Sequence, residues 1–592
     1  RLIISDNFPV NLTNELEHSG FGEGTILNAQ NNARLVIDLG RIAKGLTAYG
    51  NASFDVTNNS INSKGGTEAL YRLEGETPVR VVDAVTVTDL SLAYYNVLKR
   101  TAGYAGMSYD REFGKSALSA DAIFYAALEE VISNADDFQP SKVEDLYLSA
   151  NYGYDNRYIV QFDLAYSGSN RMPEGKRFSL YPTAGLAWIA SNEQFLSDSR
   201  VIDYLKVYGS AGIMGINDYY LQGYNPFYLN ETLWTLSGGW QSGVAGLPGE
   251  WVNIYKLSQT GSADFVLPKR RFVNTGVKTQ LFSQSLEIEI NYFNEKNYDK
   301  ISNRSATTPS VIGSPQFLPA VNYGEDVRWG FDGLVQLTKH AGDFSYGIGA
   351  NAMYMRGKYL VVDEPDAMPE YQKRAGTDMD AFWLYEAEGL FQSETEISSR
   401  GITQSWGALQ PGDIRYSNIN DDNVIDELDI HKTDYHSPRF FYGINLSAGY
   451  RGFRIFLLGQ GVADGNVMLS SGRYFMINGT SQNYSELMLD RYPVTNDYPR
   501  LTTVSVNNYQ YSTFWVAKAA YFRLKNIELS YTLPATVSRK LAMNDLIIFA
   551  RGTNLAAVSS LKKYSVDPEN LNAGITGYPL FRTITVGVSC KF

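Results

Sequence analysis

The segment NINDDNVIDELD, Asn418 to Asp429, places oxygen side chains at the spacing of a calcium-binding loop of the EF-hand type. Side-chain oxygens would come from positions 1, 3, 5, 9 and 12, and position 7 would offer its backbone carbonyl. The segment has Asn423 at position 6 where the pattern has glycine, and asparagine tolerates the left-handed backbone required there. Position 1 is Asn, and position 12 is Asp rather than the longer Glu. The predicted ligands are Asn418, Asn420, Asp422, Val424, Asp426 and Asp429.

Two interpretations of this segment remain open. It is either a structural Ca²⁺ site of weak affinity or an Asx-rich turn whose side chains bond its own backbone. His431 and His436 follow closely and could supply further ligands, although loop histidines are usually solvated.

Tryptophans form a second candidate set. Aromatic faces stack on sugar rings and on peptide side chains, so tryptophans in long connections are candidates for substrate binding. The alternative is that they pack the loops together or contact a partner protein. The five candidates are Trp234, Trp240, Trp251, Trp383 and Trp406.

Sequence motifs and charge exclude other classes of function. The chain has no G-x-S-x-G, no P-loop and no H-E-x-x-H motif, so we do not expect an enzyme. It carries 63 acidic and 51 basic residues, with a net charge of −12. Because an acidic surface repels phosphate backbones, nucleic acid is not expected as a partner.

The elements that must position these residues are predicted to be strands. Apolar and polar residues alternate strictly in residues 160–166, 286–292 and 442–450 and in the closing segment 581–592. This period of two indicates half-buried strands, and about twenty such segments approach the ~9–11 residues of a tilted membrane strand. A soluble sandwich with its apolar faces turned to a core is the alternative. No apolar run approaches the ~20 residues of a membrane helix.

The lengths of the connections favour a membrane barrel over a sandwich. Short and long connections alternate, and counting back from the C-terminus places every long one on the rim opposite the chain's end. Outer-membrane barrels have short periplasmic turns and long extracellular loops. We therefore predict an all-β, transmembrane antiparallel β-barrel with long extracellular loops. In its closing strand Ile584, Val586, Val588 and Cys590 would face lipid, with Phe592 at the periplasmic interface.

Several segments, in the same order, are similar to those of SusC/RagA-type TonB-dependent outer-membrane transporters. The resemblance covers most of the chain from about Asp145 onward and is most specific in the C-terminal third. Its segments are FWLYEAEGLFQSETEI (382–397), PGDIRYSNINDDNVIDELD (411–429), AYFRLKNIELSYTLP (520–534), ARGTNLAAVSSLKKYSVDPE (550–569) and GYPLFRTITVGVSCKF (577–592).

The resemblance implies a 22-stranded barrel in the outer membrane of a Gram-negative bacterium, closed by an N-terminal plug. It further implies uptake of oligosaccharides or oligopeptides with energy from TonB, and a SusD-like surface lipoprotein as a lid. The alternative is a barrel of this descent that no longer transports and serves as a structural subunit of an outer-membrane assembly.

The N-terminal part departs from the family pattern. Residues 1–144 resemble no plug segment and no TonB box, and they are predicted to form early barrel strands; residues 145–592 are the C-terminal barrel portion with its long loops. The chain begins at RLIISDNFPV, without Met or a leader. Either the plug and the first strands are missing from this chain, or the protein has lost them. Because an open 22-stranded pore would be hazardous to a cell, we expect a truncated chain, in which TonB would act through a plug that this sequence does not contain.

Overall fold

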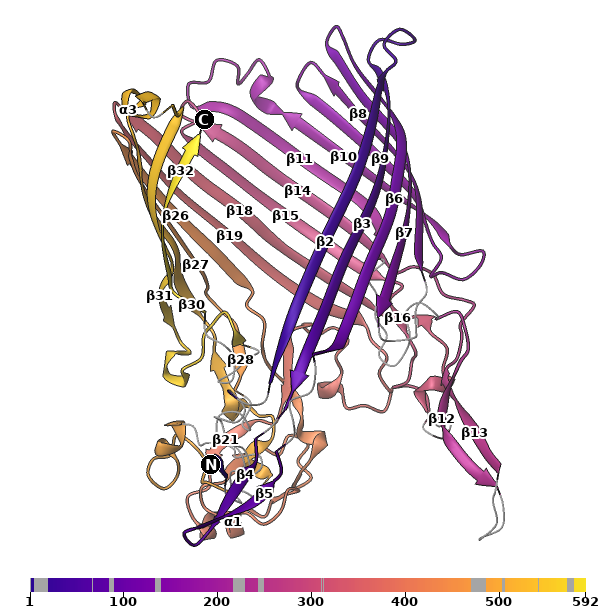
Figure 1. Ribbon diagram of the computed structural model, residues 1–592, viewed down its shortest axis with the longest axis vertical. Helices are drawn as coiled ribbons and strands as arrows, with labels where there is room; N and C mark the ends of the chain where they lie inside the picture. The colour runs from indigo at the N-terminus through magenta and orange to yellow at the C-terminus, as the bar shows by residue number, and fades with distance from the viewer. Residues whose placement is uncertain are drawn as a thin grey trace.

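The protein is described by a computed structural model in which seventeen strands form a closed barrel (Figure 1). The described residues are 2–4, 17, 20–66, 68–84, 90–133, 140–216, 229–242, 250–309, 311, 314–469, 486–502, 506–540, 542–571 and 580–591. The barrel strands are β2 (Gly20–Asp38), β3 (Leu46–Gly65), β6 (Ser91–Phe113), β7 (Ser116–Ser133), β8 (Ser141–Tyr154), β9 (Tyr158–Ser169), β10 (Phe178–Ile189), β11 (Ile202–Gly215), β14 (Lys269–Leu281), β15 (Leu286–Tyr298), β18 (Glu325–Ala341), β19 (Phe344–Val361), β26 (Phe440–Tyr450), β27 (Phe453–Val462), β30 (Tyr521–Thr532), β31 (Asp545–Ser559) and β32 (Thr583–Lys591).

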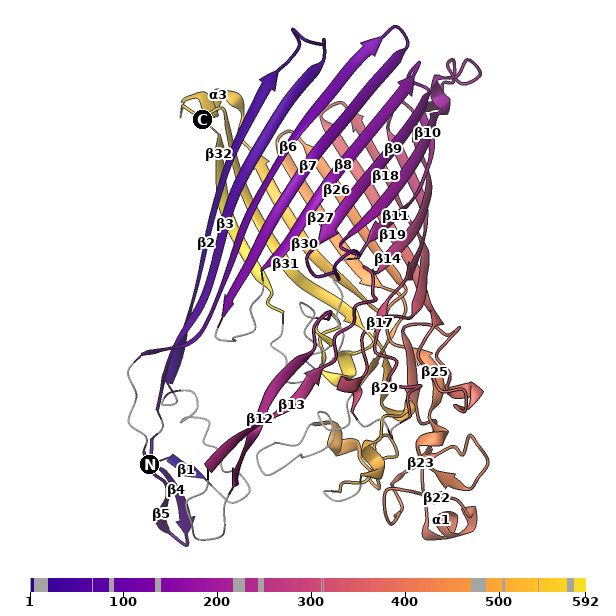
Figure 2. The same cartoon turned by 90° about the vertical axis from the view of Figure 1, so that its right-hand side faces the viewer.

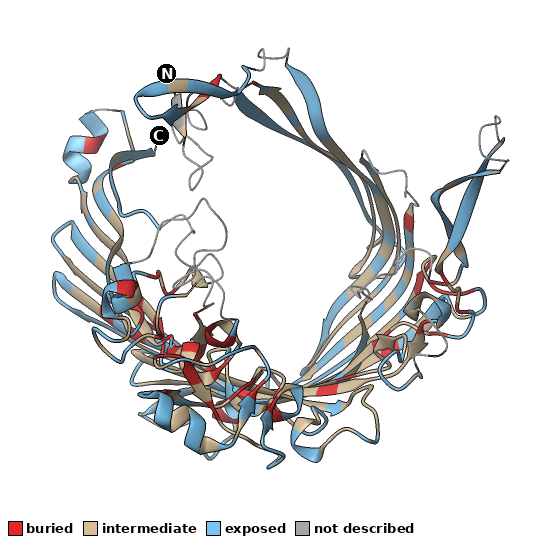
Figure 3. Cartoon of the chain, turned by 90° about the horizontal axis from the view of Figure 1, so that it is seen from below, coloured by how far each residue is buried: buried red, intermediate tan, exposed pale blue. Residues whose placement is uncertain are grey.

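Each barrel strand pairs antiparallel with the next one in chain order, from β2 through to β32. The prediction of an all-β antiparallel barrel is thereby confirmed. The seventeen strands among the described residues are fewer than the 22 that the resemblance implies. Seen from the loop end, the strands are arranged in a ring (Figure 3).

The two faces of the barrel wall differ in polarity as the alternating pattern predicts. On the outside, Ile290 of β15 and Phe331 and Val335 of β18 are exposed by 58%, 53% and 45%. On the inside of the same strands, Asn291 donates to Asp332 over 2.9 Å. Large apolar side chains directed outward are stable in a bilayer and costly in water, so this wall is built for lipid.

Buried apolar clusters lie in the loops rather than in the wall. The three clusters of the described residues are centred on Tyr416, on Leu561 and on Phe265. Figure 3 shows the buried residues gathered among the loops. Among the described helices, none is both long and apolar enough to cross a membrane.

Short turns collect at one end of the barrel, together with the C-terminus (Figure 1). The turns predicted at 155–157, 282–285 and 451–452 all lie there. The turn at 451–452 adopts the left-handed conformation that two-residue hairpins require: Arg451 has φ 45° and Gly452 has φ 89°. The helix α3 (Ala535–Lys540) lies at the same end. Phe592, predicted at this rim, lies outside the described residues.

Long connections and their small elements occupy the opposite end (Figure 2). A hairpin of β12 (Leu233–Ser242) and β13 (Glu250–Gln259) projects there by itself. The other elements of this end are β1 (Leu2–Ile4), β4 (Leu70–Glu74), β5 (Thr77–Val82), β16 (Ile301–Ser302), β17 (Val321–Asn322), β20 (Ala381–Leu384), β21 (Ala387–Leu390), α1 (Glu394–Arg400), β22 (Thr403–Gln404), β23 (Ile414–Tyr416), β24 (Val424–Ile425), β25 (His431–Tyr435), β28 (Asn466–Met468) and β29 (Val516–Lys518). Short 3-10 turns include η5 (Glu370–Gln372), η6 (Glu427–Asp429), η7 (Glu486–Asp490), η8 (Asn507–Tyr509) and η9 (Thr513–Trp515).

Two of the long loops fold together into one unit, here called the loop module: residues 362–439 and the described part of 463–518. Its core joins Ile414 and Tyr416 of the first loop to Met488 and Trp515 of the second. Buried polar groups also cross between the loops. Asn508 accepts the Ile414 N–H over 2.9 Å and donates to the Asp413 carboxylate over 2.8 Å. The loop module is therefore a folded body with its own core.

Candidate substrate-binding sites

A cavity of about 580 Å³ lies within the loop module and is called the loop cavity below. Aromatic rings from separate segments line it: Phe382 and Trp383 on β20, Trp406 just after β22, and Tyr511 beyond η8. The lining also includes two acidic residues, Asp426 and Glu427. The cavity thus combines apolar faces with negative charge, and such a combination is found where proteins bind small ligands.

Local packing fixes the positions of these rings. Trp383 lies opposite Lys432 in the β20–β25 pair. The Trp406 ring meets the Tyr385 ring edge to face, with centroids 4.9 Å apart and planes at 80°. On Trp383 the Arg374 guanidinium stacks at 5.7 Å from the ring centroid. Aromatic pairs of this geometry stabilise by about 0.5–1.5 kcal/mol beyond their burial, so the wall is held in place before any ligand arrives.

The electrostatic character of the loop cavity is negative. The pKa of Tyr385 is raised to about 12, first by burial and then by the charges of Glu427, Asp426 and Asp429. Each of these effects disfavours the negatively charged phenolate form of Tyr385. A cation placed in the cavity would therefore be stabilised by the same field.

The structure divides the five predicted tryptophans into two groups. Trp383 and Trp406 line the loop cavity together. Trp234, Trp240 and Trp251 lie on the β12–β13 hairpin and are exposed by 63%, 60% and 65%. Both side views show this hairpin apart from the strands of the loop module (Figures 1 and 2). The hairpin tryptophans therefore cannot contribute to the same binding site in this arrangement.

The predicted metal loop, Asn418 to Asp429, forms a chain of turns held by its own side chains. Asn420 Oδ1 accepts the Asp422 N–H over 3.2 Å, and Asp422 Oδ1 accepts the Val424 N–H over 2.8 Å. Asn423 is left-handed, with φ 67°, as its position in the pattern requires. These bonds are those of Asx turns.

At the end of this loop Asp429 is fully buried. Its carboxylate accepts the Ile419 N–H over 2.6 Å and the Asp426 N–H over 2.9 Å, closing a capping box at η6. Among the described residues, no group of three or more His, Cys, Asp or Glu side chains is placed to hold a metal ion. The Ca²⁺ site therefore stays a prediction, and the hydrogen bonds favour the Asx-turn alternative.

The two histidines near this loop have protein neighbours. His431 Nε2 lies 3.7 Å from the Glu386 carboxylate. The His436 ring packs against the Phe382 ring, with centroids 5.5 Å apart.

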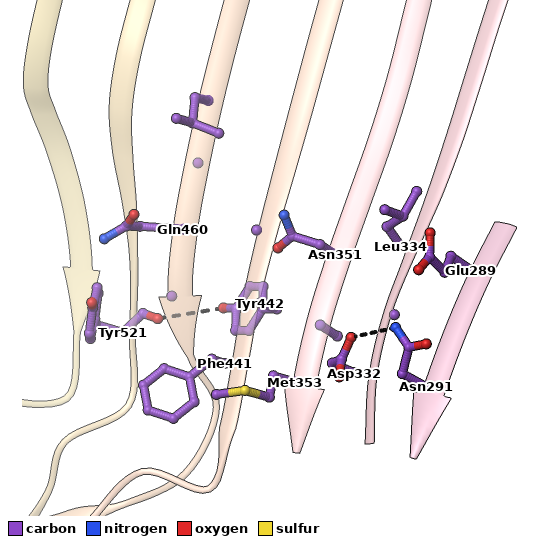
Figure 4. A pocket seen from close by; sticks show the side chains of 16 residues that line it. Glu289, Asn291, Asp332, Leu334, Asn351, Met353, Phe441, Tyr442, Gln460 and Tyr521 are labelled. Atoms are coloured by element: carbon purple, nitrogen blue, oxygen red, sulfur yellow. Dashed lines mark hydrogen bonds between the residues drawn. The ribbon is translucent and has the colours of Figure 1, made fainter. Parts of the chain in front are cut away.

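A second pocket, of about 530 Å³, lies on the barrel wall and is called the wall pocket (Figure 4). Six strands contribute to it: β15, β18, β19, β26, β27 and β30. Figure 4 shows Asn291 donating to Asp332 at one side and Tyr442 donating to the Tyr521 carbonyl, over 3.5 Å, at the other. Asn351 lies between these two pairs, and Gln460 lies beside the Tyr442–Tyr521 pair.

The wall pocket is not evident from the sequence pattern alone. The signal that could have revealed it is Gly443, which faces Asn351 across the β19–β26 pair. A Cβ at Gly443 would come within 2.7 Å of the Asn351 side-chain oxygen, so a larger residue there would displace the Asn351 side chain from its present position. Such a residue becomes informative only once the register of the two strands is known.

The sequence comparisons find relatives among outer-membrane receptors. TonB-dependent receptors P3 and P26 of Formosa agariphila are 24% and 22% identical over 473 and 485 residues, which are 75% and 77% of this chain and 45% and 47% of theirs. TonB-dependent receptor SusC of Bacteroides thetaiotaomicron is 33% identical over 82 residues, 13% of this chain and 8% of its own. The chain thus spans about half the length of the first two relatives. No protein-family model matches it.

The structural comparisons agree on the fold. A solved structure of the RagAB peptide transporter superposes with a TM-score of 0.70 at 18% identity, covering 96% of this chain and 62% of that one. The same importer in its closed-closed state gives a TM-score of 0.70 and a coverage of 96% and 63%.

Proposed function

We propose that this chain, a relative of the SusC/RagA-type TonB-dependent outer-membrane transporters, forms the barrel through which oligosaccharides or oligopeptides are imported. The chain is an outer-membrane β-barrel, and its relatives are receptors rather than enzymes. The observation that supports import best is the barrel itself, which combines an outward apolar face with an inner face lined by polar groups such as Glu289, Asn291 and Asp332. A polar inner wall suits a hydrated solute rather than a lipid.

Energy would come from TonB, as the names of the relatives indicate for those proteins. A SusD-like surface lipoprotein would cover the loop end, and the loop module is the surface we assign to it. The solved neighbour is described as a peptide importer, which is why peptides stand beside oligosaccharides among the candidate substrates.

Uptake by cells tests this proposal. We would delete the gene that encodes this chain in its own host and measure accumulation of a fluorescent peptide mixture and of a fluorescent oligosaccharide mixture. Import predicts that accumulation of one mixture falls at least tenfold and returns when the gene is restored. Inhibiting the proton-motive force should abolish the restored uptake. Unchanged accumulation of both mixtures would contradict import and favour a structural subunit of an outer-membrane assembly.

A further inference from the structure

We propose that the loop cavity recognises a cationic side chain, so that the substrate is a peptide containing lysine or arginine. This inference rests on the proposed import function and adds to it the chemistry of the substrate.

The walls of the cavity suit a cation. Trp383, Trp406 and Tyr511 come from three separate segments and all line the cavity. Tyr511 is 66% exposed and can be reached by a ligand, whereas Tyr385, in contact with the Trp406 ring, is only 5% exposed. A ring face attracts an ammonium or guanidinium group placed within about 6 Å of its centroid.

The carboxylates of the cavity supply the matching charge. Asp426 uses Oδ1 to accept the Leu428 N–H over 2.8 Å, at the start of η6. Glu427, next to it, is exposed. Within the described part of the chain, neither carboxylate has an ion-pair partner, and no Lys, Arg or His lines the cavity. A ligand cation would therefore complete a charge pair that the protein leaves open.

Cations near the cavity are engaged elsewhere. Arg439 pairs with Asp378 and Asp380 at 3.2 and 3.0 Å, and Lys432 lies 3.8 Å from Asp378. Arg374 stacks on Trp383 from outside the cavity lining. That contact shows that this indole already accepts a guanidinium on one of its faces.

A neutral sugar would use the cavity less completely. Its ring could stack on an indole, but its hydroxyl groups need no net charge opposite them. The negative field that raises the pKa of Tyr385 would contribute little to a neutral ligand. The carboxylates therefore favour a cationic peptide over a neutral glycan.

Calorimetric titration of the full chain in detergent at low ionic strength tests the inference. The probes are Ac-Ala-Lys-Ala-NH₂, its neutral counterpart Ac-Ala-Gln-Ala-NH₂, and a neutral trisaccharide. We expect the lysine peptide to bind at least tenfold more tightly than the glutamine peptide, with the difference reduced by salt. Glu427→Gln should remove most of this preference, and Tyr511→Ala should weaken the lysine peptide several-fold.

Glu370→Gln is the matched control, because Glu370 lies in the same loop, is almost fully exposed and, among the residues that the structure describes, forms its ion pair with Lys373 alone. It should leave the preference unchanged. Equal affinity for the two peptides in the wild type, or binding of the trisaccharide alone, would overturn the inference. If such a result were found while deletion of the gene still lowered cellular uptake, the import function would stand. Conversely, the purified chain could prefer the lysine peptide while deletion of its gene changes no uptake. That outcome would contradict the import function and leave the binding preference standing.

Discussion

Asp429 carries more of the loop's structure than any other residue of the segment 418–429. Its buried carboxylate satisfies the backbone N–H groups of Ile419 and Asp426, ten and three residues away. Asp429→Ala would leave both donors unpaired, and each such loss costs about 1–3 kcal/mol. We expect faster proteolysis within 418–429 and an unchanged heat-modifiable barrel, both measured by gel electrophoresis.

Asp421→Asn is the control for this substitution. Asp421 is exposed and left-handed, with φ 61°, and asparagine tolerates that conformation. Proteolysis should proceed at the wild-type rate in this variant. Equal rates in the Asp429→Ala variant and the wild type would contradict the role given to Asp429.

The calcium prediction for the same segment is tested by a chelator. A site with few carboxylates and a short residue at its last position should bind weakly, at about 10⁻⁴–10⁻³ M. If Ca²⁺ occupies it, EGTA should accelerate proteolysis at 418–429 in the wild type, and added Ca²⁺ should reverse the effect. The same rate with and without EGTA would leave only the Asx-turn alternative.

Asp378 links the loop module to the barrel and should make this link sensitive to acid. Burial acts to raise its pKa, but hydrogen bonding from Arg356 and the charges of Arg439, Arg356 and Lys432 hold the pKa below its usual value. A lowered pKa means that the carboxylate stabilises the fold above the unfolded pKa of about 4, and that this contribution is lost as the pH falls through the folded value.

We therefore expect the loop module to become protease-sensitive as the pH drops below about 4, before the barrel itself unfolds. Asp378→Asn should be more sensitive already at pH 7 and should respond less to acid. The measurement is the rate at which the loop module is cleaved, with an acid-active protease below pH 4 and a second protease at pH 7. An acid response of the same size in this variant would rule Asp378 out as the cause.

At the scale of elements, the turn between β26 and β27 has only two residues, and both are left-handed. In Gly452 a Cβ would come within 2.7 Å of the Thr532 carbonyl oxygen. Gly452→Ala should therefore reduce barrel stability by about 1–2 kcal/mol, measured as a lower urea midpoint. Arg451→Gly, at φ 45°, removes a left-handed non-glycine residue and should not lower the midpoint. Equal urea midpoints for the Gly452→Ala variant and the wild type would contradict this prediction.

Strands of the barrel could be predicted from the sequence because their pattern is local. In β15, Ile288 and Ile290 alternate with Glu287 and Glu289, and pairing with β14 keeps these two sets on opposite faces. Lipid outside and water inside impose the same alternation on every strand. The alternation, together with the residues that favour left-handed turns, is enough to predict the barrel from the sequence.

The loop module could not be predicted in the same way, because its core depends on pairs distant in sequence. Asn508 bonds to Ile414 and Asp413, more than ninety residues away. No periodicity connects these positions. For the same reason, Trp406 was recognisable as a candidate, whereas its neighbours Tyr385 and Glu427 in the cavity were not.

For the whole molecule, the sorting of turns and loops predicts which end of the barrel faces outward. Cys590 is the only cysteine, so it can be replaced by Ser and single cysteines introduced elsewhere. Glu370→Cys in the loop module should react with an impermeant maleimide on intact cells. Asn156→Cys in the β8–β9 turn should react only after the outer membrane is opened. Labelling of Asn156→Cys on intact cells would contradict the proposed orientation.

A lid on the loop end is the remaining prediction for the whole molecule. The loop module has a buried polar centre in which Asp413 is fully buried and binds Arg500 over 2.7 Å. Loops of this length with their own core are usually functional, and a folded body keeps its surface in one shape for a partner. We expect a SusD-like surface lipoprotein to bind residues 361–439 and 462–518 and to bury more than ~2,000 Å², because a lid that reopens and recloses needs a lasting attachment.

Pull-down on the barrel after gentle detergent extraction measures this association. Asp413→Ala removes a fully buried carboxylate that binds the half-buried Arg500 and the buried Asn508. Each buried donor left unpaired costs about 1–3 kcal/mol, so this change should disorganise the loop module. The lipoprotein should then be lost while the barrel still shows heat modifiability. Trp240→Ser on the β12–β13 hairpin leaves the loop module intact and should keep the lipoprotein bound. A barrel without an outer partner has no evident use for so large a folded surface. Recovery of the wild-type barrel alone, or with periplasmic partners only, would therefore contradict the lid and favour the structural subunit.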